Sequence, residues 1–180
     1  MSAWDKWDFR YLELARHVAG WSKDPAAAVG AVIVDEHKDR VIALGFNGFP
    51  SGVEDRYDRL SDSDLKNEMV VHAEQNALLF AGRMAKGCSI YIVGKPVCAR
   101  CAVLIIQAGI KRVVARKPKD GTDSYWDKCG KTSLEMFDEA DVSFVDSTEY
   151  DTVPVEPDKY SAEAIINTLL YMPEKPKDVA

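Results

Sequence analysis

Hydrophobic and polar positions divide the first part of the chain into one helix and two strands. Apolar side chains recur at helical spacing over residues 4–21, with charged residues between them, and this pattern predicts an amphipathic helix. The runs AVGAVIV (28–34) and RVIALGF (40–46) flank the polar DEHKD, which predicts a hairpin. The next stretch, 47–64, is rich in Gly, Pro, Asn and Asp, so we expect a loop there.

Strands and helices alternate in the rest of the pattern. A helix is expected to begin within MVVHAEQNALLF (69–80) and to run to about Gly82. The sequence then predicts a strand, a helix, a strand, a loop, a helix and a strand, at 89–94, 98–109, 111–115, 116–123, 125–140 and 142–145. Such alternation is typical of a parallel sheet covered by helices. The expected fold class is therefore α/β, with a three-layer α/β/α architecture.

The composition changes near residue 147. A chain of 180 residues suits one well-filled domain, which we place at 1–146. The remaining segment, 147–180, is rich in proline and charge, with a short helix expected within YSAEAIINTLLYM (160–172). The Ile and Leu side chains of that helix could dock on the domain or on a second subunit, and the sequence does not decide between them.

Charge and hydropathy exclude two classes of protein. The net charge of −6 argues against a nucleic-acid binder, because such proteins usually carry a basic excess that neutralises phosphate. No apolar run reaches the roughly 18 residues of a membrane span, and the N-terminus lacks the apolar region of a secretory signal. We therefore expect a cytoplasmic protein without a membrane partner. In that reducing compartment the four cysteines are expected to be thiols or metal ligands.

Two polar residues, His72 and Glu74, interrupt the apolar stretch 69–80. Side chains two positions apart point in nearly opposite directions in the middle of a helix, but in the first turn both can reach one point beyond the helix end. If a metal ion lies at that point, His72 can bind it while Glu74 reaches a molecule on the far side of the ion.

Two thiols in the segment PVCARC supply the remaining metal ligands. Cys98 and Cys101 are expected in the first turn of a helix, where their spacing places both sulfurs on one side and the helix N-terminus stabilises thiolates. One imidazole and two thiolates suit Zn²⁺ and leave the fourth tetrahedral position to water, as in a catalytic site. Zinc lowers the pKa of that water to about 7, which makes hydroxide available at neutral pH.

These motifs resemble those of the cytidine deaminase superfamily, whose signature is H-x-E followed by P-C-x-x-C. Over about residues 8–145 the chain is similar to the deoxycytidylate (dCMP) deaminases. The matching segments are SKDP with VGAVIV, then GFNGFPSG, HAEQNAL and CARCAVLIIQAGIKRVV. The resemblance implies a cytidine deaminase-like fold with a five-stranded mixed sheet, one zinc ion per subunit, a small-molecule nucleotide substrate and a homo-oligomer. It also implies conversion of dCMP to dUMP with release of ammonia.

The resemblance also implies roles for individual residues. His72, Cys98 and Cys101 would bind zinc, and Glu74 would move protons between the zinc-bound water, N3 of the pyrimidine and the departing amine. Asn47 would bond to the sugar, and the main chain around Ala73 would contact the base.

The phosphate needs a separate assignment, because Ala26, Ala27 and Ala28 stand where the family has small polar residues. Loops at the carboxyl ends of strands gather around the site in α/β sheets, and a basic loop follows the strand predicted at 111–115. We therefore expect the phosphate to be held by five polar or basic residues, Ser22, Lys23, Arg116, Lys117 and Lys119. The alternative is that this basic loop is simply solvated.

Other interpretations stay open at this point. The substrate could instead be dCTP, cytidine, deoxycytidine or an adenosine in tRNA, or the chain could be a non-catalytic module stabilised by zinc. A redox role for the C-x-x-C would leave His72 and Glu74 without a purpose. The other cysteines and histidines are expected to be packing or surface residues: Cys88, Cys129, His17 and His37.

Overall fold

The computed structural model describes residues 6–122 and 124–151 of the chain. Its helices and strands are, in chain order, α1 (Lys6–Ala19), β1 (Gly30–Asp35), η1 (Glu36–Lys38), β2 (Arg40–Phe46), α2 (Tyr57–Ser61), α3 (Ser63–Met69), α4 (Ala73–Ala81), η2 (Gly82–Ala85), β3 (Ser89–Val93), α5 (Ala99–Gln107), β4 (Arg112–Ala115), α6 (Tyr125–Glu139), β5 (Ser143–Asp146) and α7 (Thr148–Asp151). The helix predicted at 160–172 lies outside the described residues, so the division of the chain near residue 147 stays a prediction.

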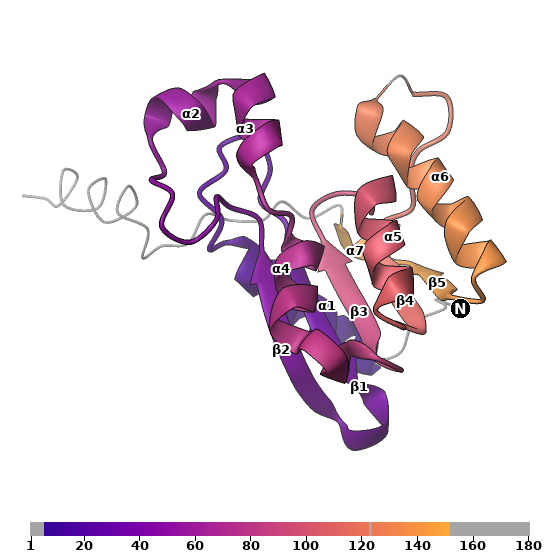
Figure 1. The fold of residues 1–180 in the computed structure, drawn as a ribbon. Helices are drawn as coiled ribbons and strands as arrows, with labels where there is room; N and C mark the ends of the chain where they lie inside the picture. Colours follow the sequence, from indigo (N-terminus) through magenta and orange to yellow (C-terminus); the bar gives the residue numbers. More distant parts are fainter. Residues whose placement is uncertain (1–5, 123, 152–180) are drawn as a thin grey trace, which may run out of the picture.

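The strands form one mixed sheet of five strands in the order β2-β1-β3-β4-β5 (Figure 1). Strand β1 runs antiparallel to both β2 and β3, whereas β3, β4 and β5 are parallel to one another. The parallel strands are joined by α5 and α6, which is the crossover arrangement that parallel pairing requires. The predicted α/β class and the mixed five-stranded sheet are confirmed.

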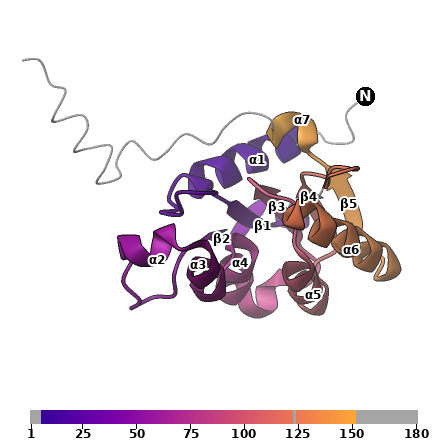
Figure 2. The same ribbon diagram turned by 90° about the horizontal axis from the view of Figure 1, so that it is seen from above.

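Helices cover both faces of the sheet, which confirms the three layers. Seen from above, α1 and α7 lie on one side of the strands, and α4, α5 and α6 lie on the other (Figure 2). The strands are buried on both faces, so alternate residues enter two separate cores. Val32 and Tyr91 belong to the core under α1, whereas Ile33 and Ile90 belong to the core under α4, α5 and α6.

Two glycines allow helices to lie directly against the sheet. A Cβ atom on Gly45 of β2 would overlap the main chain of α4 at Ala73 and Ala77, and one on Gly30 of β1 would overlap the main chain of α1 at Ala15. Neither position therefore has room for a larger residue. The close approach at Gly45 fixes the N-terminal end of α4 over the sheet.

The loop predicted at 47–64 is wrong in its second half, where α2 and α3 form. The Asp62 side chain accepts hydrogen bonds from the main-chain N–H groups of Asp64 and Leu65, and this cap starts α3. The next helix begins within the predicted stretch 69–80, at Ala73. Val71 is extended and forms a β-bridge with Gly48, so α3 ends at Met69 and α4 begins only at Ala73.

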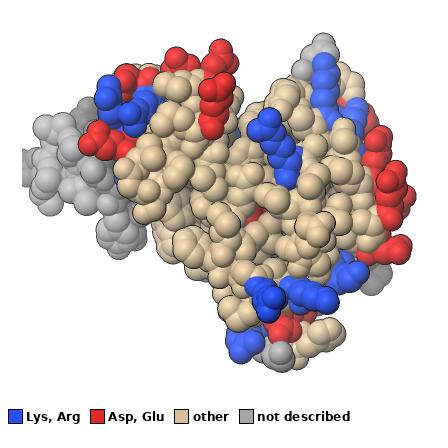
Figure 3. All heavy atoms as spheres, viewed as in Figure 1, with Lys and Arg blue, Asp and Glu red and all other residues tan. Residues whose placement is uncertain are grey.

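One face of the molecule exposes a group of large apolar side chains, which we call the α4–α5 surface. Figure 3 shows that the area over these helices has few charged side chains, while Lys and Arg gather below it. Its members all belong to α4, η2 or α5 and are between 44% and 77% exposed: Leu79, Phe80, Met84, Val103 and Leu104. Within residues 6–122 and 124–151, no helix is both long enough and apolar enough to cross a membrane. The cytoplasmic location stays a prediction.

Candidate active site

The start of α4 positions His72 and Glu74. His72 is the N-cap of this helix and has an extended backbone, with φ −72° and ψ 157°. Its main-chain N–H donates to Oε1 of Gln75 at 3.0 Å, and the bridge between Val71 and Gly48 holds the preceding residue. Both side chains therefore belong to the first turn of the helix, as the spacing predicted.

The start of α5 positions the two thiols in the same way. Cys98 is the N-cap of α5, and Cys101 lies one turn further on. The preceding residue, Val97, is buried, and its carbonyl oxygen accepts a hydrogen bond from Ser133 Oγ of α6 at 2.8 Å. This bond ties the turn that carries Cys98 to α6.

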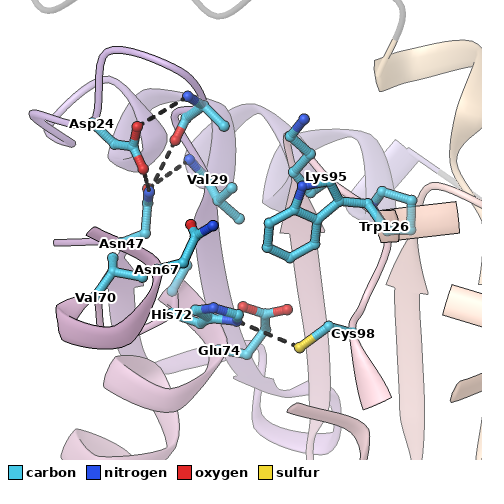
Figure 4. A pocket seen from close by; sticks show the side chains of 13 residues that line it. Asp24, Val29, Asn47, Asn67, Val70, His72, Glu74, Lys95, Cys98 and Trp126 are labelled. Carbon is cyan, nitrogen blue, oxygen red and sulfur yellow. Dashed lines mark hydrogen bonds between the residues drawn. The ribbon is translucent and has the colours of Figure 1, made fainter. Parts of the chain in front are cut away.

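The three predicted ligands converge on one point. Nδ1 of His72 lies 3.5 Å from Sγ of Cys98 and 3.3 Å from Sγ of Cys101, and all three atoms lie within 4.8 Å of one another (Figure 4). A tetrahedral zinc ion with usual bond lengths would separate a nitrogen and a sulfur ligand by about 3.6 Å. The spacing of these atoms therefore fits zinc with little movement.

The two thiols differ in their affinity for protons. Hydrogen bonds from Cys101 and His72 lower the pKa of the Cys98 thiol to about 4, although burial opposes this shift. The hydrogen bond to Cys98, together with burial, raises the pKa of Cys101. The hydrogen bond with Cys98 also raises the pKa of His72, against the effect of burial. The lowered pKa of Cys98 favours the thiolate, which is the form that binds a metal ion.

Glu74 is a buried carboxyl group beside the three ligands. It is only 4% exposed, and burial raises its pKa even though the nearby His72 lowers it. It is not one of the three converging ligand residues. Figure 4 shows its carboxylate beside His72 and Cys98, at the wall of a pocket. A carboxyl group with a raised pKa can accept and return protons near neutral pH.

The pocket extends from these residues toward α1 and α6. It is lined by residues from six parts of the chain: Asp24, Ala27, Val29, Asn47, Asn67, Val70, His72, Ala73, Glu74, Lys95, Pro96, Cys98 and Trp126. A second pocket adjoins it and shares Asn67, His72, Cys98 and Trp126 with it. The ring of Trp126 lies 5.9 Å from that of His72, measured between centroids, at an angle of 50°.

A network of polar side chains holds one wall of the pocket. Asn47 is buried and accepts a hydrogen bond from the main-chain N–H of Val29, while its amide donates to Ala27 and Asp24. Asp24 also pairs with Lys66 of α3 at 2.7 Å, with side chains 9% and 6% exposed. This wall is therefore fixed by buried, paired groups.

The structure brings some of the predicted substrate contacts to the pocket and leaves others outside it. Asn47 and Ala73 line the pocket, whereas the five residues expected to hold the phosphate are not among its lining residues. Ser22 Oγ donates to the carbonyl of Asn47, and Lys23 pairs with Asp55 at 2.7 Å. Lys117 and Lys119 are exposed. The assignment of the phosphate to these residues stays a prediction.

Several pocket residues have no motif that would mark them in the sequence. Trp126 lies in a predicted helix, whereas Lys95 and Asn67 fall between the predicted segments, in the turn after β3 and in α3. Their meeting depends on tertiary packing. The other predicted packing residues behave as expected, since Cys88 is buried and His17 and His37 are exposed.

Comparison with known proteins places this geometry in a family. Residues 5–117 match the model of the cytidine and deoxycytidylate deaminase zinc-binding region. A protein of Aliivibrio fischeri described as an uncharacterized deaminase in the luxG 3' region is 40% identical over 137 residues, which cover 76% of this chain and 90% of that protein. The deoxycytidylate deaminases of Pongo abelii and Homo sapiens are 37% and 36% identical over 146 residues, 77% of this chain and 78% of each relative.

Solved structures show the same fold. The dCMP deaminase of the cyanophage S-TIM5, in complex with dCMP and dUMP, has a TM-score of 0.59 and 25% identity, covering 77% of this chain and 94% of its own. RibD of Acinetobacter baumannii, at 24% identity and a TM-score of 0.56 over 81% of this chain and 36% of its own, shares the fold alone.

Proposed function

Since the chain belongs to the cytidine and deoxycytidylate deaminase family, we propose that it hydrolyses the amino group of a cytosine deoxynucleotide. In the favoured form, dCMP and water give dUMP and ammonia, which is the activity that the names of its relatives carry. The convergence of His72, Cys98 and Cys101 beside the buried Glu74 is the observation that carries this proposal.

The three ligands would hold one zinc ion. A neutral imidazole and two thiolates form a donor set that prefers zinc to magnesium or calcium, and their spacing matches tetrahedral coordination. With three protein ligands, the ion would keep an open position and polarise a water molecule there. Because Cys98 and His72 are the N-caps of two helices, they present their ligand atoms from turns that the helices hold in place.

Glu74 would move the protons of the reaction. It takes a proton from the attacking water as the oxygen adds to C4 of the pyrimidine, and it delivers a proton to N3. It then takes the remaining proton from the oxygen on C4 and passes it to the amine, so that the C4=O bond forms as the C4–N bond breaks and ammonia leaves. Burial supports this role, because it raises the pKa of Glu74 toward the range where a carboxyl group both accepts and returns a proton.

The pocket walls would orient the nucleotide. By the family resemblance, the main chain around Ala73 contacts the base and Asn47 contacts the sugar, and both residues line the pocket. Trp126 closes the opposite side and limits the access of water to the pyrimidine.

A panel of substrates tests the proposed reaction. Cytidine, deoxycytidine, CMP, dCMP, dCTP and an adenosine-containing tRNA are incubated with the wild-type protein, and the loss of the amino group is followed by absorbance and by ammonia release. Zinc is measured in the same sample. We expect about one zinc ion per chain and the highest kcat/KM with dCMP. Zinc without turnover of any compound would instead identify a non-catalytic, zinc-stabilised module.

We also propose that the chain forms a homo-oligomer through the α4–α5 surface. Burying a fully exposed Leu or Phe side chain contributes about 1.5–3 kcal/mol, and exposed apolar patches of this kind are typical of protein interfaces. The two helices lie side by side, so the same surface on a second copy can pack against them in a two-fold symmetric arrangement.

A further inference from the structure

Lys95 places a positive charge on the wall of the active-site pocket. It stands in the turn between β3 and α5, directly before Pro96, and it lines the pocket together with His72 and Glu74. Among the described residues that line this pocket, it is the only lysine or arginine. Its position was not singled out by any motif in the sequence.

Lys95 contacts an aromatic ring and pairs with no carboxylate among the residues that the structure describes. Within the described part of the chain, its ammonium group forms no ion pair. Instead, Nζ of Lys95 lies 5.9 Å from the centroid of the Trp126 ring. Asp24, which lines the same pocket, is already paired with Lys66. A partly buried cation without a carboxylate partner favours the binding of an anion.

The position of Lys95 suits one end of a nucleotide. In Figure 4 the indole of Trp126 lies between the Lys95 side chain and the group formed by His72, Glu74 and Cys98. A pyrimidine that presents C4 to Glu74 and its sugar to Asn47 could therefore direct its phosphate toward Lys95. The lysines of the β4–α6 loop, Lys117 and Lys119, are outside the lining of this pocket.

We propose that Lys95 binds the 5′-phosphate of the substrate and so makes the pocket selective for a nucleotide over a nucleoside. The inference rests on the proposed deaminase function. It assigns Lys95 to the phosphate, which takes no part in the reaction at C4. Binding energy from the phosphate appears in both the ground state and the transition state, so the loss of Lys95 raises KM more than it lowers kcat.

The test compares Lys95→Ala and Lys95→Arg with a matched variant, Lys111→Ala. Lys111 is an exposed lysine before β4, at the opposite end of the parallel strands from the pocket, so its variant removes one charge and leaves the site intact. KM and kcat are measured for dCMP and for deoxycytidine. If deoxycytidine reacts too slowly, the inhibition constants of dUMP and deoxyuridine replace these values.

We expect Lys95→Ala to raise the KM for dCMP by about tenfold to hundredfold, with kcat and the values for deoxycytidine changed less than about threefold. Lys95→Arg retains the charge and restores most of the affinity, and Lys111→Ala matches wild type. The same KM for dCMP in Lys95→Ala and wild type, or an equal loss for dCMP and deoxycytidine, overturns the proposal for Lys95.

The two proposals fail in different ways. A wild-type protein that deaminates no cytosine compound contradicts the proposed function itself. Active wild type with an unchanged Lys95→Ala variant contradicts only the phosphate assignment. In that case, a raised KM for dCMP in the Lys117→Ala/Lys119→Ala double variant would assign the phosphate to the β4–α6 loop.

Discussion

At the scale of single residues, the proton-transfer role proposed for Glu74 comes with a cost in stability. The side chain is almost fully buried, and burial raises its pKa. For an acid with a raised pKa in the folded state, the stability that its neutral form contributes is present at low pH and is lost as the pH rises through the raised pKa. The ionised carboxylate that the proposed reaction needs is therefore held at the expense of the free energy of unfolding.

Replacing this carboxyl group is expected to separate stability from activity. In metal-free protein, Glu74→Gln should raise the midpoint of thermal unfolding by a few degrees at pH 8 and by less at pH 5, because the amide removes the cost of a buried charge. The same variant should keep its zinc and lose at least about 99% of its turnover. Thermal unfolding with a chelator, zinc analysis and the dCMP assay measure these effects.

The matched control is Glu135→Gln, which changes an exposed carboxylate on α6. It should match wild type in all three measurements. Wild-type turnover in Glu74→Gln would remove this residue from the reaction.

The convergence of the proposed ligands could be predicted from the sequence because much of their geometry is local. His72 with Glu74, and Cys98 with Cys101, are each separated by two or three positions, and each pair lies at the start of a helix whose pattern is visible in the chain. Lys95 and Trp126 could not be predicted as neighbours, because the turn after β3 and the start of α6 meet only in the folded structure.

At the scale of elements, the sheet determines where α4 can lie. Gly45 lets the first turn of α4 approach β2 so closely that any larger residue would meet its main chain. This turn carries His72 and Glu74. The position of one proposed zinc ligand, His72, therefore depends on a residue of the adjacent strand.

Adding one methyl group at Gly45 should shift this turn. Gly45→Ala is expected to lower the free energy of unfolding by about 1–3 kcal/mol and to weaken zinc binding. Gly30→Ala produces the same kind of overlap with α1 on the opposite face of the sheet, so it should destabilise the protein to a similar extent with less effect on zinc. Chemical denaturation and competition with a zinc-binding dye measure the two quantities.

Equal zinc affinity in the two alanine variants, at equal stability, would contradict the dependence of His72 on β2. The comparison is made at about 10–20 °C, near the temperature of maximum stability, so that a loss of about 1–3 kcal/mol leaves most of the protein folded.

The elements that the sequence did not predict are those stabilised by single contacts. The long helices and the strands were predicted because many positions repeat one pattern, whereas α2 and α3 are short and lie in a segment rich in turn residues. The cap by Asp62 and the bridge from Val71 to Gly48 decide the local structure there. Such contacts have little weight in a pattern of hydrophobic positions.

At the scale of the whole molecule, the α4–α5 surface is the feature that one copy of the chain leaves unexplained. Leu79 and Phe80 are 75% and 77% exposed, although they belong to the same helix whose first turn carries Glu74. Contact with a second copy would cover them and would also restrain α4 and α5, which carry the zinc ligands.

A charge on this surface is expected to prevent self-association. Phe80→Glu should convert the oligomer to a monomer at micromolar concentration, since a carboxylate buried at an interface without a partner costs several kcal/mol. Tyr57→Glu is the matched control, because Tyr57 is 84% exposed on α2, away from the α4–α5 surface. Light scattering after gel filtration measures the mass, and an unchanged oligomer in Phe80→Glu would rule out this surface.

The bond from Ser133 to Val97 has a consequence for how α6 can vary. The same helix contributes Trp126 to the pocket and, one to two turns later, fixes the turn that leads into Cys98. A displacement of α6 thus alters the pocket wall and the coordination geometry together. Substitutions that move this helix are therefore expected to weaken metal binding and substrate binding at the same time.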